Sequence, residues 1–141
     1  MRIVTAIEIS APRELVWEFV SDPGHVLHFM SGMTRWEVDG KAERGLGARY
    51  RMLMRVRSAE VGGLVEVVEW DEPADIAWTS VTGIDQRGRW RLRATPEGTE
   101  VTLRLTYSVP GGLLGLVADA LAAPIVRGHV QRSLEALAEL S

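Results

Sequence analysis

The sequence predicts one α+β domain, in which a curved antiparallel sheet of about seven strands wraps around a long C-terminal helix. Three observations support this prediction. The opening residues alternate between apolar and polar side chains, as a half-buried strand does. Residues 34–109 form a series of short alternating segments divided by turn residues, which is typical of an antiparallel meander. Pro110, Gly111 and Gly112 end that region, and after them apolar residues recur at the spacing of a helix.

The N-terminal part of the chain predicts a strand and two short helices. Residues 3–10 alternate as a strand. Pro12 then lies at an early helical position, where its missing N–H is not needed. Asp22 can cap a second short helix that ends near Met30. The chain length of 141 residues fits a single domain that covers residues 1–141.

The middle of the chain predicts six further strands, over residues 35–39, 48–57, 61–70, 76–82, 87–95 and 101–107. The strand at 48–57 has two distinct faces, and we expect its arginines to face solvent and to pair with acidic side chains of the sheet. These arginines are Arg49, Arg51, Arg55 and Arg57, and the acidic residues are Glu37, Asp39 and Glu66. The inward positions carry unusually bulky side chains, namely Trp36, Tyr50, Met52, Met54, Trp78, Trp90 and Tyr107.

The C-terminal helix differs between its two halves. Its second half is amphipathic, with Val126, Val130 and Leu134 on one face. Its first half, residues 113–125, is apolar nearly all round, and Pro124 should kink or break the helix there. We expect this segment first to be a gate over a cavity and second to be a homodimer contact. A patch that touches a membrane or a partner is a third interpretation, and residues 30–33 could cover the segment instead.

The composition excludes several function classes. The net charge is −3 and the acids and bases are interspersed, so the chain lacks the basic footprint of a nucleic-acid partner. Cysteine is absent, which excludes disulfides, thiolate nucleophiles and zinc–cysteine sites and fits a cytoplasmic protein. No export signal is evident, and the most apolar stretch contains Asp119 and Pro124 and is too short for stable membrane insertion. We expect no cofactor.

Several stretches carry a resemblance to a known family. They are Ala11-Pro12-Arg13-Glu14-Leu15-Val16-Trp17, Glu69-Trp70-Asp71-Glu72-Pro73 and Gly88-Arg89-Trp90-Arg91-Leu92. With this order of elements, the chain resembles the helix-grip superfamily of START domains and the birch-pollen allergen (SRPBCC). More narrowly, it resembles the bacterial polyketide cyclase/dehydrase and lipid-transport group. The resemblance implies a cavity between sheet and last helix, in proteins that range from aromatase/cyclases to quinone and lipid carriers.

The bulky inward side chains either fill a solid core or line a ligand pocket. Methionines adapt to ligands of varied shape, which favours the pocket. The residues that we expect to bind a ligand are Phe29, Trp36, Tyr50, Met52, Met54, Trp78, Trp90, Leu92, Leu105, Tyr107, Leu114, Val117 and Leu121. The resemblance implies that cyclase members use an interior arginine together with tyrosine. No arginine here takes a clearly inward strand position, which argues against cyclase chemistry.

Three residues are candidates for chemistry in the pocket. Tyr50 and Tyr107 could hold ligand carbonyls, although hydroxyls satisfied within the protein are the commoner case. His28 is the best candidate for a titratable group at the cavity mouth. Asp22, His25 and His28 recur every three residues, a spacing that drifts by about 60° per step around a helix, so we expect no metal site.

Three functions remain open from the sequence. The first is the binding or transport of an apolar small molecule, such as a lipid, a polyketide or an isoprenoid-like compound. The second is a polyketide cyclase or dehydratase that uses Tyr50, Tyr107 and His28. The third is a protein-interaction module that uses the face of residues 113–125. We favour the first, because the sequence contains no evident acid–base constellation and no nucleotide-binding motif.

Overall fold

The computed structural model describes the backbone of residues 1–108 and 113–141 and the side chains of residues 1–108 and 122–141. The predicted α+β helix-grip fold and its order of elements are confirmed. The elements are β1 (Arg2–Ile9), α1 (Arg13–Ser21), α2 (Pro23–Phe29), β2 (Met33–Val38), β3 (Arg49–Val56), β4 (Ala59–Asp71), β5 (Asp75–Ser80), β6 (Asp85–Thr95), β7 (Gly98–Ser108) and α3 (Leu113–Leu140).

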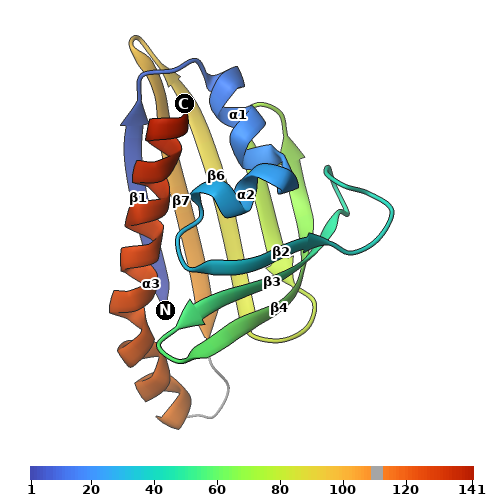
Figure 1. Cartoon of the computed structure of the whole chain (residues 1–141), viewed down its shortest axis with the longest axis vertical. Coiled ribbons are helices and arrows are strands. Elements are labelled where there is room, and N and C mark those ends of the chain that lie inside the picture. The colour runs from blue at the N-terminus through green and yellow to red at the C-terminus, as the bar shows by residue number, and fades with distance from the viewer. Residues whose placement is uncertain (109–112) are drawn as a thin grey trace.

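The seven strands form one antiparallel sheet in the order β1-β7-β6-β5-β4-β3-β2. The first two strands of the sequence are therefore the two edges of the sheet. Helices α1 and α2 connect these edges across the concave side, and α3 runs along β1 and β7 on the same side (Figure 1). This arrangement leaves the inner face of the central strands opposite the helices, where a ligand could be enclosed.

Alternation along the strands separates an inner from an outer face. In β3 the side chains of Tyr50, Met52 and Met54 are buried, whereas Arg49, Arg51 and Arg55, at the opposite parity, are exposed. The predicted pairing of outer arginines with acidic residues is confirmed for Asp39 and Glu66, which lie 2.8 Å from arginines of β3. Two details differ from the prediction. Glu37 pairs with Arg35 two residues away, and Arg55 of β3 pairs with Glu60.

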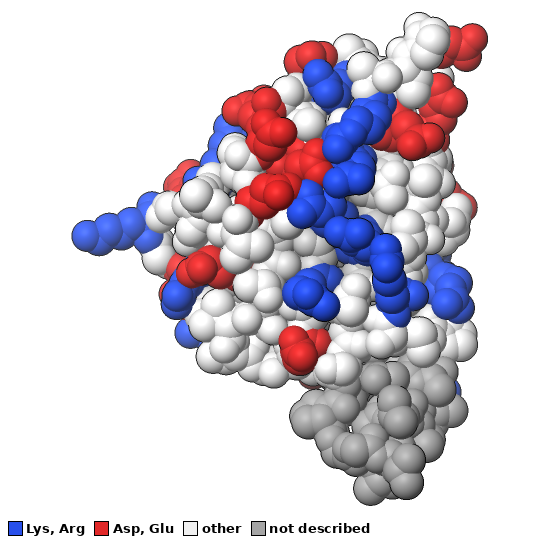
Figure 2. Space-filling view, turned by 180° about the vertical axis from the view of Figure 1, so that it is seen from behind, with Lys and Arg blue, Asp and Glu red and all other residues white. Residues whose placement is uncertain are grey.

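The outer face also holds a cluster of ion pairs around Asp75 at the start of β5. The Asp75 side chain is only 7% exposed and accepts hydrogen bonds from Arg89, Arg91 and Arg93 of the neighbouring strand β6. Burial raises the pKa of this carboxyl, but the hydrogen bonds from Arg93 and Arg89 outweigh burial and hold the pKa below its usual value. Figure 2 shows basic and acidic side chains side by side across this face. The cluster ties β5 to β6 on the side away from the helices.

Helix α3 continues through Pro124, so the predicted break at this residue does not occur. Pro124 has no N–H to donate to the carbonyl oxygen one turn earlier in the helix. Because Pro124 is exposed, water can hydrogen-bond to that carbonyl instead. The buried residues Val126, Val130, Leu134 and Leu137 hold the rest of the helix against the core. Among the described residues, no helix is long and apolar enough to cross a membrane.

Candidate ligand-binding site

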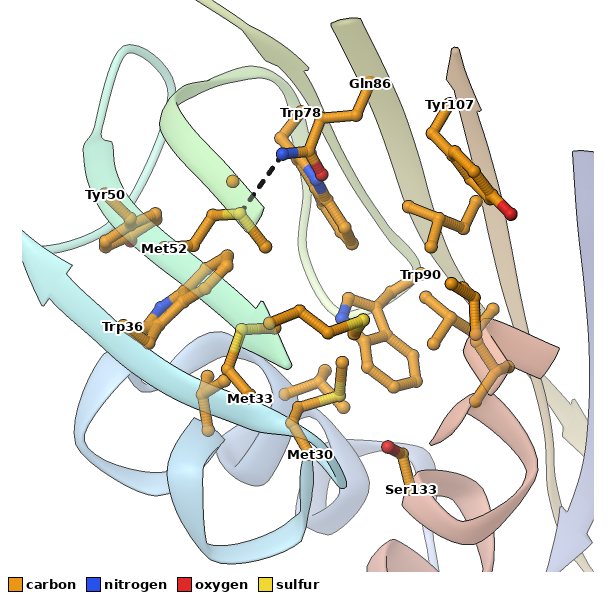
Figure 3. A pocket seen from close by; sticks show the side chains of 18 of the residues that line it. Met30, Met33, Trp36, Tyr50, Met52, Trp78, Gln86, Trp90, Tyr107 and Ser133 are labelled. Atoms are coloured by element: carbon orange, nitrogen blue, oxygen red, sulfur yellow. Dashed lines mark hydrogen bonds between the residues drawn. The ribbon is translucent and has the colours of Figure 1, made fainter. Parts of the chain in front are cut away.

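A cavity of about 310 Å³ lies between the inner face of the sheet, the α1–α2 corner and α3. Its volume is near the lower end of the range for small-molecule sites and corresponds to about ten water molecules of liquid. Figure 3 shows large apolar side chains converging on this space from β2, β3, β5 and β6. The cavity therefore decides between the two sequence interpretations, because the bulky side chains line a space and do not fill it.

Most of the expected ligand-binding residues with described side chains line the cavity. They are Phe29, Trp36, Tyr50, Met52, Met54, Trp78, Trp90, Leu105 and Tyr107. Leu92 is not among the lining residues, because this side chain is fully buried in the hydrophobic core. Leu114, Val117 and Leu121 lie outside the residues whose side chains are described. That any of these residues binds a ligand stays a prediction.

Aromatic rings set the shape of the cavity wall. Trp36 stacks on Tyr50 with ring centroids 4.9 Å apart and meets Trp78 edge-on at 6.3 Å. Trp78 lies directly across the β5–β6 ladder from Gly88. A Cβ at Gly88 would approach Trp78 Cζ2 to 2.1 Å. The missing side chain of Gly88 thus lets the Trp78 indole lie flat over β6 and form part of the wall.

The two tyrosines line the cavity but are already engaged within the protein. The Tyr50 hydroxyl donates a hydrogen bond to the Glu43 carbonyl oxygen at 2.7 Å. Burial raises the pKa of Tyr50 to about 12, with a smaller lowering by Arg44 and a further rise from Asp22. The hydroxyl is therefore protonated at neutral pH, with its proton held by a backbone carbonyl. Tyr107 on β7 also takes part in an interaction within the protein.

His28 is not among the residues that line the cavity, and its role at the cavity mouth stays a prediction. Its side chain is exposed, and the inward face of α2 is formed by Val26 and Phe29. One residue of helix turns a side chain by about 100°, which places His28 away from the face that carries Phe29. His25 lies 3.8 Å from the Asp22 carboxylate. Within residues 1–108 and 122–141, no group of three acidic or histidine side chains could hold a metal ion.

Three polar residues of the cavity wall, Ser21, Gln86 and Ser133, are not among the residues predicted from the sequence. The Ser133 hydroxyl accepts a hydrogen bond from the Ser31 amide at 2.8 Å and donates one to the His129 carbonyl at 2.7 Å. These bonds fix α3 to the connection between α2 and β2. The predicted strand begins at Arg87 and so omits Gln86, whereas β6 begins two residues earlier. The alternation that carries Trp90 inward would have identified Gln86.

Methionines form the most adaptable part of the wall. Met30 and Met33 flank the connection between α2 and β2, and Met52 of β3 lies across the cavity from them (Figure 3). Met54 of β3 lines the cavity as well. Thioether side chains are unbranched and polarizable, so they adjust to irregular apolar surfaces. The sequence suggests residues 30–33 only as a cover for the last helix, but two of them line the cavity itself.

Comparison with known proteins agrees with this architecture. A family model described as polyketide cyclase / dehydrase and lipid transport matches residues 1–141. The crystal structure of TTHA0849 from Thermus thermophilus has 25% sequence identity and a TM-score of 0.85, over 99% of this chain and 95% of that chain. The solution structure of the KanY protein has 17% identity and a TM-score of 0.79, over 99% and 95%.

A START superfamily protein from Mycobacterium smegmatis has 17% identity and a TM-score of 0.76, over 99% of this chain and 97% of that chain. No curated protein sequence matches the chain. The family match spans all of the chain, and the similar structures share its fold over nearly the same length. The chain therefore belongs to the polyketide cyclase/dehydrase and lipid-transport family.

Proposed function

We propose that this protein binds an apolar small molecule, such as a lipid, a polyketide or an isoprenoid-like compound, in the cavity between the sheet and α3. The observation that carries this proposal is the chemistry of the wall. Among the described residues, no arginine, lysine, histidine, aspartate or glutamate lines the cavity. Such a wall favours an uncharged ligand, because a buried charge without a partner costs a large free energy.

The energetics of filling this space with ligand atoms support a binding role. An apolar cavity forfeits the van der Waals contacts of the atoms that line it. For 310 Å³, the cost is on the order of several kcal/mol by analogy with cavities made by core substitutions. A ligand that fills the space restores these contacts. The packed core around Leu92, Val101 and Leu134 shows that the chain can fill its interior elsewhere.

The cyclase alternative has less support from the site. Two of its three candidate residues have little support, because His28 is exposed on α2 and the Tyr50 proton is held by the Glu43 carbonyl. A general acid or base must be within hydrogen-bond reach of the reacting group. The apolar character of the wall therefore favours binding over acid–base chemistry as the role of this cavity.

The role of residues 113–125 stays a prediction, because the side chains up to residue 121 lie outside the described residues. At the end that is described, Ala122 and Val126 line the cavity. This position is consistent with a cover over the ligand, the first of the sequence interpretations. The homodimer contact and the protein-interaction module remain predictions for the same segment.

A cavity-filling variant tests the proposed function. Ala122→Phe places a ring in the cavity from α3, whereas Ala42→Phe adds the same ring at an exposed position of the β2–β3 connection. Equilibrium dialysis with 2-methylnaphthalene should give saturable binding to the unmodified protein and to Ala42→Phe. The dissociation constant should rise by about tenfold or more for Ala122→Phe, since the ring occupies the ligand's volume.

Two results would contradict the proposal. One is the absence of saturable binding to the unmodified protein; the other is equal binding by a folded Ala122→Phe variant. Native mass spectrometry of protein purified from its own host should also show an uncharged apolar adduct. This measurement addresses the natural ligand, whereas dialysis addresses the cavity.

A further inference from the structure

Gln86 brings an amide group into an otherwise apolar part of the cavity. The residue is 6% exposed and lies at an inward position of β6. Its backbone amide donates a hydrogen bond to the Ser80 hydroxyl at 3.2 Å, which fixes the start of the strand. In Figure 3 the side chain projects into the cavity beside Trp78, with its nitrogen turned toward Met52. A buried amide at this place needs partners for both of its ends.

Only one end of the Gln86 amide has a partner among the described residues. Nε2 donates to the Met52 Sδ at 3.1 Å, and a thioether sulfur is a weak acceptor. Within the same part of the chain, Oε1 accepts no hydrogen bond. Among the described residues, the buried side-chain atoms without a partner are Arg13 Nε and Arg89 Nε, so Oε1 is not sealed within the protein and stays open to a donor in the cavity. A ligand donor in the cavity would supply the missing bond.

The other polar side chains of the wall differ from Gln86 in this respect. The Ser21 hydroxyl accepts from Arg44 Nη1 at 3.4 Å, and the hydroxyls of Tyr50 and Ser133 have the partners described above. Tyr107 is engaged as well. The indole nitrogens of the tryptophans are hydrogen-bond donors only, so they cannot accept a hydrogen bond from a ligand. Gln86 Oε1 therefore differs from the hydroxyls of Ser21, Tyr50 and Ser133 in one respect: within the described wall it takes part in no hydrogen bond, whereas each of these hydroxyls already has a partner.

We propose that Gln86 Oε1 accepts a hydrogen bond from a hydroxyl group of the ligand, so that the ligand is an uncharged apolar molecule with a hydroxyl at the β6 side of the cavity. This inference rests on the proposed function and adds the polar group and its position. The hydrogen bond from Gln86 Nε2 to the Met52 sulfur supports the assignment of the ligand group as the donor. It gives the amide nitrogen a partner, whereas the oxygen has none among the described residues.

Three probes of one ring system test the inference by equilibrium dialysis. 2-Naphthol carries a donor, 2-methoxynaphthalene carries only an acceptor, and 2-methylnaphthalene carries neither. The quantity to compare is the dissociation constant of each probe relative to that of 2-methylnaphthalene, which cancels general effects on the cavity. Gln86→Leu should raise the relative dissociation constant of 2-naphthol by about tenfold, the effect of losing one buried hydrogen bond. The relative value for 2-methoxynaphthalene should stay unchanged.

Gln131→Leu is the matched control. Gln131 lies on the exposed face of α3 and donates to Glu135, so its replacement should leave all three relative affinities unchanged. If Gln86→Leu does not fold, Gln86→Met removes the same amide with an unbranched side chain. In the unmodified protein, the side-chain amide resonance of Gln86 should shift with 2-naphthol by more than with 2-methylnaphthalene in a ¹⁵N correlation spectrum.

The outcomes separate this inference from the proposed function. If all probes bind but neither Gln86 variant changes the relative affinity for 2-naphthol, the Gln86 inference fails and the proposed function stands. If 2-methoxynaphthalene loses affinity as much as 2-naphthol does, the amide acts as a donor and the assignment of a ligand hydroxyl is overturned. If no probe binds the unmodified protein, the proposed function itself fails.

Discussion

Replacing Gly88 by alanine tests whether this glycine shapes the cavity wall through Trp78. A Cβ at Gly88 would lie 2.1 Å from Trp78 Cζ2 and 2.3 Å from Cε2, far inside van der Waals contact. The alanine and the indole cannot both keep their places, so the ring must move. The cavity borders Trp78 on its inner side, and the indole can relieve the clash by shifting into that space.

The free energy of this change follows from two opposing effects. Overpacking by an added methyl group costs about 1–3 kcal/mol. Alanine in place of glycine within a strand stabilises by about 0.5–1 kcal/mol, because the unfolded chain loses less entropy on folding. The net loss in the free energy of unfolding for Gly88→Ala should therefore be about 0–2.5 kcal/mol. With Trp78→Leu the clash is absent, and the same alanine should stabilise.

Urea unfolding of the four proteins of this double-mutant cycle, followed by circular dichroism, measures the coupling between the two sites. The expected coupling energy is about 1–3 kcal/mol, equal to the clash alone. Gly88→Ala should also weaken the binding of 2-methylnaphthalene, since the displaced indole takes up cavity volume. If Gly88→Ala has the same effect on stability in both backgrounds, within about 0.5 kcal/mol, the reasoning is refuted.

Two further predictions concern titratable groups. Asp75→Asn should lower the free energy of unfolding at pH 7 by about 2 kcal/mol, since charge-assisted hydrogen bonds to Arg89 and Arg93 weaken. Because the folded-state pKa of Asp75 lies below the usual value of 3.8, its stabilisation is present above that pH and is lost as the pH falls through the lowered pKa. Urea unfolding from pH 7 to pH 2 should therefore show that the difference in the free energy of unfolding between the unmodified protein and Asp75→Asn becomes smaller in acid. A difference that stays constant over this range would contradict the assignment of this stabilisation to the ionised Asp75 carboxyl. For Tyr50, whose pKa is raised to about 12, the ultraviolet difference between the unmodified protein and Tyr50→Phe should show no tyrosinate until the pH is well above 10. The protonated Tyr50 hydroxyl contributes fully to the free energy of unfolding below the unfolded pKa of about 10, and this contribution is lost as the pH rises toward 12. Ionisation of Tyr50 near pH 10 would contradict both the burial of this hydroxyl and its hydrogen bond to Glu43.

Much of the fold was predictable because strand alternation is a local property. Two-residue periodicity assigns Tyr50, Met52 and Met54 to the inner face of β3 from neighbouring residues alone. The same periodicity would have assigned Gln86, but the predicted strand begins at Arg87. Strand ends depend on where the ladder to the next strand begins, and β6 pairs with β7 from Asp85. Boundaries are therefore less predictable than faces.

The site residues divide in the same way. Trp36, Trp78 and Trp90 are predicted inward and line the cavity. Leu92 shares the inward parity of Trp90, but its place along β6 puts it in the packed core. Proximity to Phe29 in sequence suggested a cavity position for His28, whereas the rotation of a short helix separates the two side chains. The parity of a residue along a strand predicts which face of the sheet its side chain lies on. Whether an inward side chain lines the cavity or packs in the core depends on the other elements that pack against that part of the strand.

The sequence by itself determined which face of each strand is apolar, where the helices lie along the chain, and that the outer face is charged, because these follow from spacing between near neighbours. Only the tertiary structure decided that the inner face encloses a cavity of about 310 Å³. That volume depends on the distance between sheet and α3, which contacts between distant residues set, such as Ser31 with Ser133. A contact between distant residues also engages the Gln86 nitrogen with the Met52 sulfur in the cavity wall.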